Sequence, residues 1–181
     1  MMKRLGWRVT GELPAESHFV VIAAPHTSNW DLFYLLGAAT ALGMRVSWIG
    51  KHTLFVGPLG PFFRAIGGIP IDRRRSQKMV EQMVDQFETR DRLNLAIPPE
   101  GTRGRSEYWK SGFYWMAYKA QVPVSLGFLD YRKKEGGLGP LVYLTGNVRQ
   151  DMDEIRAFYE NVSGLRPENY GPIRFRDEPA D

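Results

Sequence analysis

One short apolar run constrains the fold more than any other feature of this chain. Residues 18–24 read HFVVIAA, and Pro25 follows them directly. Proline has no backbone N–H to donate to a neighbouring strand, so the run ends there and is typical of a buried β-strand. Over residues 31–42 the leucines and alanines recur at helical spacing instead. The start of the chain therefore predicts a buried strand, a short turn and a helix.

Two side chains that can take part in catalysis flank this turn. His26 follows Pro25, and Asp31 comes five positions later at the start of the helix. Residues five apart on one helix point to different faces, so the two can touch only if His26 precedes the helix and Asp31 lies in its first turn. Ser28 suits the N-cap, and Asp31 three residues later completes a capping-box-like pattern. The residues alone leave two interpretations open: a catalytic pair, or a turn histidine beside an aspartate that only favours the positive end of the helix.

Strand-like and helix-like segments alternate through most of the remaining sequence. This alternation predicts an α/β fold, in which one mainly parallel central sheet is flanked by helices in a single domain. We expect that domain to cover residues 1–175 and residues 176–181 to form a disordered polar tail. Residues 132–139 are expected to be a charged, glycine-rich turn, and Asp151 is expected to cap the last helix. The expected strands are 7–12, 18–24, 46–50, 68–71, 93–97, 122–129 and 141–145, and the expected helices are 31–42, 77–89, 109–120 and 152–161.

Composition excludes several kinds of active site. The chain has no cysteine, which rules out disulfides, thiolate metal sites and a cysteine nucleophile, and suits a reducing cytosol. The three histidines, His18, His26 and His52, do not have the spacing of a metal site. The sequence contains no Gly-x-Ser-x-Gly elbow, no phosphate loop ending in Gly-Lys-Ser or Gly-Lys-Thr, and no Gly-x-Gly-x-x-Gly. We therefore expect no bound metal and no resident cofactor.

Charge and hydropathy indicate the kind of partner. The formal net charge is +4, and basic residues gather over 64–78 and again at Arg103, Arg105 and Lys110. Such clusters suit phosphates or anionic lipid, and they lack the interleaved aromatic residues of a nucleic-acid module, so we expect no nucleic-acid partner. No secretory signal or membrane-spanning run is visible, which predicts a cytoplasmic protein that is at most peripheral on the inner face of a membrane. The apolar segment 54–66, broken by glycine and proline, either folds over a core or forms a membrane-docking surface.

Three segments with polar or charged side chains each follow an expected strand. They are His26 to Asp31, Ile71 to Arg73, and Glu100 to Arg103. In a parallel sheet the carboxyl ends of the strands meet at one edge, so these segments are expected to lie close together. A base with an orienting carboxylate, placed beside arginines, suits removing a proton from a hydroxyl on an anionic acceptor.

These segments resemble the motifs of the glycerophosphate and lysophosphatidic-acid acyltransferases, the PlsC-like lysophospholipid acyltransferases. The family's first motif, a histidine and an aspartate separated by four residues, is similar to residues 26–31. Its second motif, a glycine followed by apolar residues and an arginine, resembles 68–73. Its third, usually Phe-Pro-Glu-Gly-Thr-Arg, is similar to 98–103, where Pro98 replaces the aromatic residue, and its fourth resembles 122–124, Val-Pro-Val. All four occur in the family's order.

The resemblance implies a fold, a reaction and a set of site residues. The fold would be that of the glycerolipid acyltransferases. The reaction would move a fatty acyl group from acyl-CoA or acyl carrier protein to the hydroxyl of a lysophospholipid similar to 1-acylglycerol-3-phosphate. His26 would be the general base, and Asp31 would hold its tautomer and stabilise the imidazolium. The acceptor-binding residues it implies are Arg73, Glu100, Gly101, Thr102 and Arg103. Of these, Glu100 would either orient Arg103 or contact hydroxyls of the acceptor.

The sequence leaves two other functions open. One is an acyl thioesterase in which water replaces the acceptor, although that enzyme has no use for Arg73 and Arg103 as anion ligands. The other is a non-catalytic lipid-binding protein, although a carrier does not need a base such as His26. Many relatives carry a helical anchor before the first motif; only 25 residues precede His26 here, so we expect that anchor to be absent or reduced. Peripheral docking on a membrane surface would then use residues 54–63.

Overall fold

The structure, a computed structural model, describes residues 2–71 and 76–178. Within them the strands are β1 (Arg8–Thr10), β2 (His18–Ala24), β3 (Ser47–Lys51), β4 (Gly68–Ile71), β5 (Leu93–Ile97), β6 (Val124–Asp130) and β7 (Glu135–Val142). The α-helices are α1 (Trp30–Ala41), α2 (Gly60–Ala65), α3 (Ser76–Thr89), α4 (Gly112–Ala120) and α5 (Val148–Tyr159), and the 3-10 turns are η1 (Met2–Leu5), η2 (His52–Phe55) and η3 (Pro167–Asn169).

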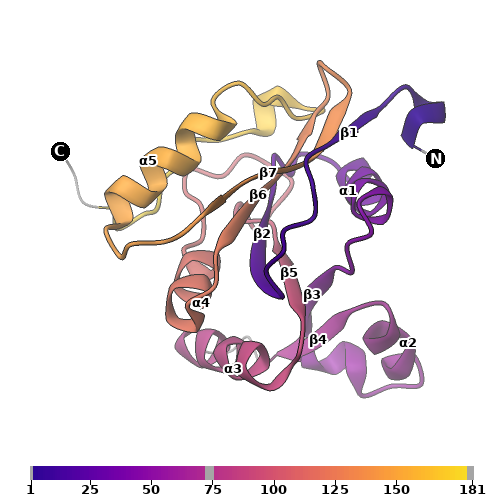
Figure 1. Cartoon of the computed structure of the whole chain (residues 1–181), viewed down its shortest axis with the longest axis vertical. Coiled ribbons are helices and arrows are strands. Elements are labelled where there is room, and N and C mark those ends of the chain that lie inside the picture. The colour runs from indigo at the N-terminus through magenta and orange to yellow at the C-terminus, as the bar shows by residue number, and fades with distance from the viewer. Residues whose placement is uncertain (1, 72–75, 179–181) are drawn as a thin grey trace.

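The strands form one seven-stranded sheet in the order β1-β7-β6-β2-β5-β3-β4 (Figure 1). Neighbouring strands run parallel, except that β6 and β7 form an antiparallel hairpin. The predicted α/β fold with a mainly parallel sheet is therefore confirmed. Parallel neighbours that are distant in sequence require crossover connections, which the helices provide.

Strand β2 lies at the centre of the sheet, between β5 and β6, as expected for an apolar run. Successive side chains of a strand point to opposite faces. Val20, Ile22 and Ala24 accordingly pack in the core under α3, α4 and α5, while Phe19 and Val21 belong to a second cluster on the other face. Both faces of β2 are covered, which explains why the sequence shows no polar alternation there.

The helices cover the two faces unequally. Helices α3, α4 and α5 cover one face, and α1 lies on the other, where Ala38 packs with Trp7 and Leu129 (Figure 1). Helix α2 lies beside the edge strand β4. No helix within residues 2–71 and 76–178 combines the length and apolar character needed to cross a membrane.

The strand directions decide where the functional segments meet. Strands β2, β3, β4, β5 and β6 all run the same way, so their carboxyl ends share one edge of the sheet. The turn at 25–31, the loop at 98–105 and Tyr131 all leave the sheet at this edge. The expected meeting of the first and third motifs is thus observed. Residue Arg73 lies outside the described residues.

The expected glycine-rich turn at 132–139 is wrong in extent. Strand β7 already begins at Glu135, and only residues 131–134 form the turn. Glycines 137 and 139 lie inside the strand, where an added Cβ would collide with the Thr10 carbonyl and the Phe158 ring respectively. These glycines therefore mark close approach of neighbouring groups within a sheet rather than a turn.

The expected cap of the last helix is also wrong. Helix α5 begins at Val148, and the Asn147 side chain caps it by accepting from the Gln150 amide at 3.2 Å. Asp151 is buried instead, and it accepts from the Tyr114 hydroxyl at 2.7 Å and the Thr145 hydroxyl at 2.8 Å. Asparagine and aspartate are nearly equivalent caps, so Asn147 can cap the helix while Asp151 is buried with hydrogen-bond partners.

Two further boundaries lie in the C-terminal half of the chain. Helix α4 begins at Gly112 rather than 109, because Trp109 forms a β-bridge with Phe175. In the segment predicted to be a tail, Glu178 forms an ion pair of 2.7 Å with Arg156 of α5. Residues 179–181 lie outside the described residues.

Candidate active site

The turn after β2 is held by its own side chains. The Ser28 hydroxyl accepts from the Trp30 amide at 3.1 Å, and Asp31 Oδ2 accepts from the amides of Thr27 and Ser28 at 2.7 and 2.8 Å. This is the capping-box-like pattern that the sequence predicts, although Asn29 and not Ser28 occupies the N-cap. Helix α1 therefore starts with a rigid turn that carries His26, the first residue after β2 that is not fully buried.

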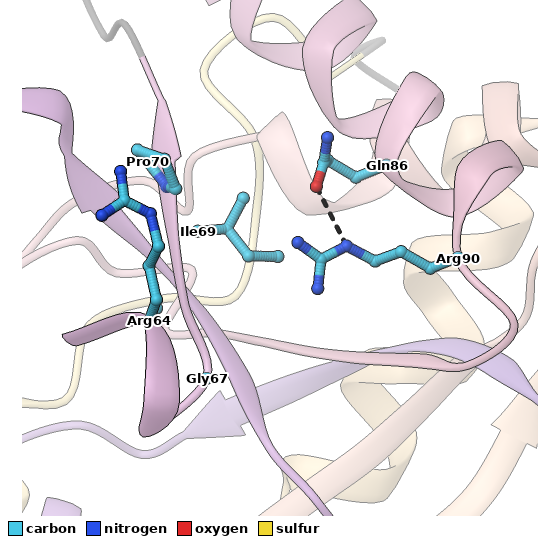
Figure 2. Close-up of a pocket in the computed structure, with 7 residues that line it drawn as sticks. Arg64, Gly67, Ile69, Pro70, Gln86 and Arg90 are labelled. Atoms are coloured by element: carbon cyan, nitrogen blue, oxygen red, sulfur yellow. Dashed lines mark hydrogen bonds between the residues drawn. The ribbon is translucent and has the colours of Figure 1, made fainter. Parts of the chain in front are cut away.

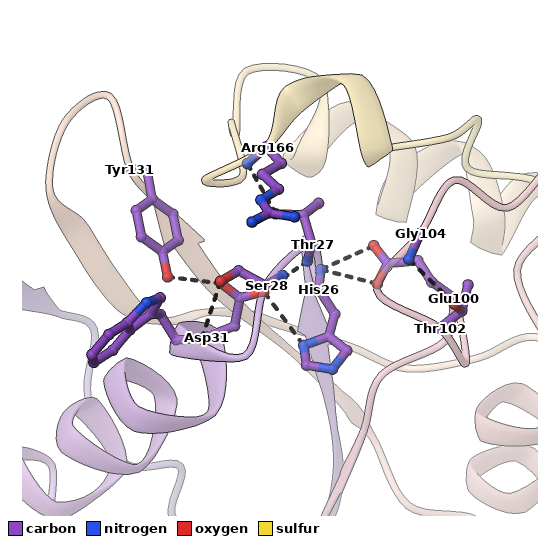
Figure 3. Close-up of polar contacts among 10 residues, drawn as sticks. His26, Thr27, Ser28, Asp31, Glu100, Thr102, Gly104, Tyr131 and Arg166 are labelled. Atoms are coloured by element: carbon purple, nitrogen blue, oxygen red, sulfur yellow. Dashed lines mark hydrogen bonds and ion pairs between the residues drawn. The ribbon is translucent and has the colours of Figure 1, made fainter.

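His26 and Asp31 come together as the sequence predicts (Figure 3). The His26 Nδ1 lies 3.4 Å from Asp31 Oδ2, which is within ion-pair reach but long for a well-formed hydrogen bond. The His26 side chain is 18% exposed and the Asp31 side chain is fully buried. The carboxylate thus faces Nδ1, and Nε2 is the nitrogen left for a substrate.

The surroundings of Asp31 favour its charged form. Burial by itself raises the pKa of Asp31, but the contacts from His26 and Tyr131 and the amides of Ser28 and Thr27 together outweigh it. The pKa of Asp31 is therefore held below its ordinary value of 3.8. A carboxylate that stays ionised beside Nδ1 can stabilise a protonated His26.

Glu100 connects the third motif to the first. Its two carboxylate oxygens lie 2.9 and 3.2 Å from the His26 amide, which donates to them (Figure 3). Glu100 is only 4% exposed, and this burial raises its pKa to about 7, although the hydrogen bond from His26 opposes the rise. The expected contact between Glu100 and Arg103 is not observed among the described residues. The carboxylate holds the backbone of His26 instead.

The rest of the third motif forms an exposed loop. Gly101 has a positive φ of 67°, and the side chain of Lys110 occupies the place where a Cβ would be. The Thr102 hydroxyl accepts from the Gly104 amide at 3.2 Å. Arg103 is exposed and makes no hydrogen bond or ion pair with any described residue. This loop presents a cation to solvent at the same sheet edge as His26.

Two contacts to the turn at 25–31 were not predicted from the sequence. The Tyr131 hydroxyl donates to Asp31 Oδ1 at 2.7 Å across 100 residues of sequence. The Arg166 amide donates to the Thr27 hydroxyl at 3.2 Å, so the segment after α5 lies against the turn (Figure 3). The signal for Tyr131 was its position directly after a strand that runs parallel to β2; no sequence signal marks Arg166.

A partly open hollow of about 270 Å³ lies elsewhere, between α2, α3 and the edge strand β4 (Figure 2). Arg90 donates to Gln86 at 3.0 Å on one side of it, and Arg64 stands on the other. Gly67 and Gly68 at the start of β4 form part of its wall. It therefore opens near the amino end of β4, opposite the edge that carries His26, and it is not the candidate active site.

Three comparisons with known proteins bear on this site. The family described as Acyltransferase matches residues 7–125. Human 1-acyl-sn-glycerol-3-phosphate acyltransferase beta is 35% identical over 115 residues, which are 60% of this chain and 40% of that protein. The crystal structure of the 1-acyl-sn-glycerophosphate (LPA) acyltransferase PlsC from Thermotoga maritima superposes with a TM-score of 0.56 at 17% identity, over 81% of this chain and 67% of that one. The matched family region contains His26, Asp31 and Glu100 and ends before Tyr131.

Proposed function

The chain belongs to the acyltransferase family, and from this premise we propose that it transfers a fatty acyl group from an acyl thioester to the hydroxyl of an anionic lysolipid such as 1-acylglycerol-3-phosphate. One observation carries the proposal. His26 stands at the carboxyl edge of the sheet with Nδ1 facing a buried, ionised Asp31 and Nε2 without a hydrogen-bond partner among the described residues. Exposed Arg103 lies in the neighbouring loop, where it can bind an anion.

The reaction follows from this geometry. Nε2 of His26 takes the proton from the acceptor hydroxyl while the hydroxyl oxygen attacks the thioester carbonyl carbon. The tetrahedral intermediate then collapses, the C–S bond breaks, and the leaving thiolate takes the proton back from His26. The products are the ester and a free thiol. The thioester supplies the activated acyl group, so the proposed reaction uses no further cofactor, and the donor is acyl-CoA or acyl carrier protein.

The neighbouring residues would support different parts of this reaction. Asp31 would stabilise the imidazolium that forms when His26 takes the proton. Glu100 would fix the His26 backbone, which favours the productive position of the ring. Arg103 would bind the acceptor phosphate, with Gly101 and Thr102 shaping its loop. We retain Arg73 as a second phosphate ligand on the resemblance alone.

The assay that tests this function measures thiol release from acyl-CoA with and without lysophosphatidic acid, together with lipid products by mass spectrometry. A transferase releases thiol only with the acceptor and forms the acylated lipid in equal amount. Release of thiol without the acceptor would identify a thioesterase. Binding of lipid without any release would identify a lipid-binding protein. The same assay with acyl carrier protein determines the donor.

We further propose that the protein reaches its lipid substrate by peripheral docking. Helix α1 exposes Trp30, Phe33 and Leu36, and the α2 region exposes Leu59 and Phe62. These side chains are 41–61% exposed, which is unusual for large apolar residues. Two exposed apolar groups on a chain with a net charge of +4 suit an anionic lipid surface.

Sedimentation with anionic vesicles tests the docking. The Leu59→Asp, Phe62→Asp variant should lose binding, because both side chains are exposed and the change places two charges in the apolar surface. Phe63 is unsuitable for this test because it packs against Trp48 and Phe55. The control is Asn147→Asp, Gln150→Glu, which adds the same charge at the start of α5. Equal binding of both variants would contradict docking through α2.

A further inference from the structure

Tyr131 contacts the catalytic carboxylate from outside the motif region. It follows β6 directly, at the carboxyl edge of the sheet, and its hydroxyl donates to Asp31 Oδ1 at 2.7 Å (Figure 3). Asp31 Oδ2 is already occupied by the amides of Thr27 and Ser28 and faces His26. Within the described residues, Tyr131 is the one hydrogen-bond partner of Oδ1. The tyrosine therefore fixes the side of the carboxylate that the turn does not.

The ring of Tyr131 is itself held in place. It packs edge-on against Trp7, with the ring centroids 4.9 Å apart, and against Tyr34 of α1, with the ring centroids 5.8 Å apart. Its amide donates to the Ser163 carbonyl at 2.9 Å, which ties it to the segment after α5. Two aromatic neighbours and a backbone hydrogen bond leave the hydroxyl little freedom. A donor that is fixed before substrate binds costs no reorganisation during the reaction.

The electrostatic surroundings agree with a donating phenol. Burial, and next the hydrogen bond to Asp31, raise the pKa of Tyr131 above its ordinary value, so the hydroxyl keeps its proton at neutral pH. The titratable groups that face Asp31 are His26, Tyr131 and, through charge alone, Glu100, while Tyr34 faces Tyr131. Asp31 is fully buried, so loss of the phenol would leave Oδ1 without a partner.

We propose that Tyr131 is a positioning residue of the acyl-transfer reaction, whose hydroxyl holds the Asp31 carboxylate so that Oδ2 keeps the His26 ring in the tautomer with a proton on Nδ1. The role rests on the proposed function of His26 as the base. It adds a third side chain to the His26–Asp31 pair, supplied by a part of the chain that follows the matched family region. Among the described residues Tyr131 makes no hydrogen bond or ring contact with His26, so in this proposal it acts only through Asp31.

The kinetic test compares two phenylalanine variants. Tyr131→Phe removes the hydrogen bond to Asp31 and keeps the ring between Trp7 and Tyr34. Tyr34→Phe removes a hydroxyl from the same aromatic cluster, and that hydroxyl makes no hydrogen bond with the described residues. We expect Tyr131→Phe to lower kcat about 10- to 100-fold, the range for a hydrogen bond to a charged group, with KM for both substrates unchanged. Tyr34→Phe should stay within about twofold.

A double-mutant cycle separates positioning from a general loss of stability. If Tyr131 acts through Asp31, adding Tyr131→Phe to Asp31→Asn should lower kcat by no more than about twofold further. A purely structural tyrosine would produce the same loss in both backgrounds. Melting temperatures of all variants set the assay temperature well below unfolding.

Nitrogen NMR gives a readout that does not depend on activity. The chain has three histidines, so 15N-labelled histidine yields three imidazoles to assign. Tyr131→Phe should lower the Nδ1–H population of His26 and leave His18 and His52 unchanged, whereas Tyr34→Phe should change none of them. This measurement also tests the role of Tyr131 if Tyr131→Phe is too unstable to assay at 25 °C, because spectra can be recorded at low temperature.

The outcomes distinguish this inference from the proposed function. Full activity of His26→Ala would remove the base and the positioning role together. Loss of activity in His26→Ala, with wild-type kcat and an unchanged His26 tautomer in Tyr131→Phe, would overturn only the role of Tyr131. The tyrosine would also be purely structural if Tyr131→Phe lowered kcat without changing the His26 tautomer, and if it lowered kcat equally in the Asp31→Asn background.

Discussion

The first and third motifs lie at the same edge of the sheet but are built in opposite ways. In the turn at 25–31, Thr27, Ser28 and Asp31 are buried, and hydrogen bonds reach it from Tyr131 after β6, from the loop after β5 and from the segment after α5. In the loop at 101–105, every residue is exposed, and Arg103 makes no hydrogen bond or ion pair with the described residues. One region is fixed from several sides, and the other is open.

The difference suits the two tasks of the proposed reaction. A general base must stand in the correct tautomer and position before substrate arrives, because misplacement by about 1 Å can cost 100-fold in rate. A cation that binds an acceptor phosphate gains its partner from the substrate itself, so its side chain can remain exposed to solvent until the substrate binds. Exposure of Arg103 also avoids the cost of a buried, unpaired charge.

The sharpest test of the fixed region removes the base. His26→Ala should lower kcat by about 10²- to 10⁴-fold, the usual contribution of general base catalysis. The control is His52→Ala, which removes an exposed histidine from η2 and should leave kcat within about twofold. Steady-state kinetics with acyl-CoA and lysophosphatidic acid measure both. A His26→Ala enzyme with near-normal kcat would mean that the fixed turn serves the fold and not the chemistry.

Local pattern was enough to predict much of this arrangement. The apolar run and Pro25 predicted β2 and its end, and the Ser28–Asp31 spacing predicted the start of α1 to within a residue. The alternation of elements predicted the parallel sheet, which brings the first and third motifs to one edge. These features depend on neighbours in sequence, where periodicity and capping chemistry carry the information.

The unpredicted features depend on partners far away in sequence. Glu100 was expected beside Arg103, but its carboxylate binds the His26 amide, 74 residues distant. Tyr131 was not singled out, because nothing local distinguishes a tyrosine that donates to a carboxylate from one that packs in a core. Within the glycine-rich stretch before Val142, composition suggested a turn where the sheet required small residues. Pairing across the sheet decides such cases, and a single sequence does not display it.

The second prediction concerns the pH dependence of the fixed turn. The pKa of Glu100 is raised by burial from 4.5 to about 7, so the folded protein binds a proton that the unfolded chain releases between those values. The contribution of Glu100 to the free energy of unfolding is fully present below pH 4.5. It is lost as the pH rises through about 7, and the total loss is roughly 3 kcal/mol. Glu100→Gln keeps an acceptor for the His26 amide and cannot ionise.

Urea unfolding at several pH values measures this effect. The stability of Glu100→Gln relative to wild type should increase from pH 5 to pH 8, while the control, Glu81→Gln at an exposed position of α3, should show no such trend. Parallel curves for wild type and Glu100→Gln would show that Glu100 stays ionised in the fold. In that case the turn would be held by a full charge and not by a group that is partly protonated at neutral pH.

The third prediction tests the open region. Arg103→Ala should raise KM for a phosphorylated acceptor about 10-fold or more and leave kcat and the melting temperature nearly unchanged, because Arg103 has no partner in the described part of the fold. The control is Arg92→Ala, which removes an exposed arginine before β5, at the opposite edge of the sheet. A large fall in kcat, or a loss of stability, would place Arg103 in the fixed region and contradict the division of roles.

The smallest effect is expected within the open loop, at its two glycines. Gly101 has a φ of 67° and the Lys110 side chain against it, whereas Gly104 has an ordinary φ and its nearest heavy atom, the Thr102 hydroxyl, would lie 3.9 Å from an added Cβ. Gly101→Ala should therefore cost about 1 kcal/mol and displace the loop, raising KM for the acceptor a few-fold. Gly104→Ala should change stability by no more than about 0.5 kcal/mol and leave KM as it is. Equal effects at both glycines would mean that the backbone at Gly101 has no part in presenting Arg103, and that the loop adopts its binding conformation only when the acceptor arrives.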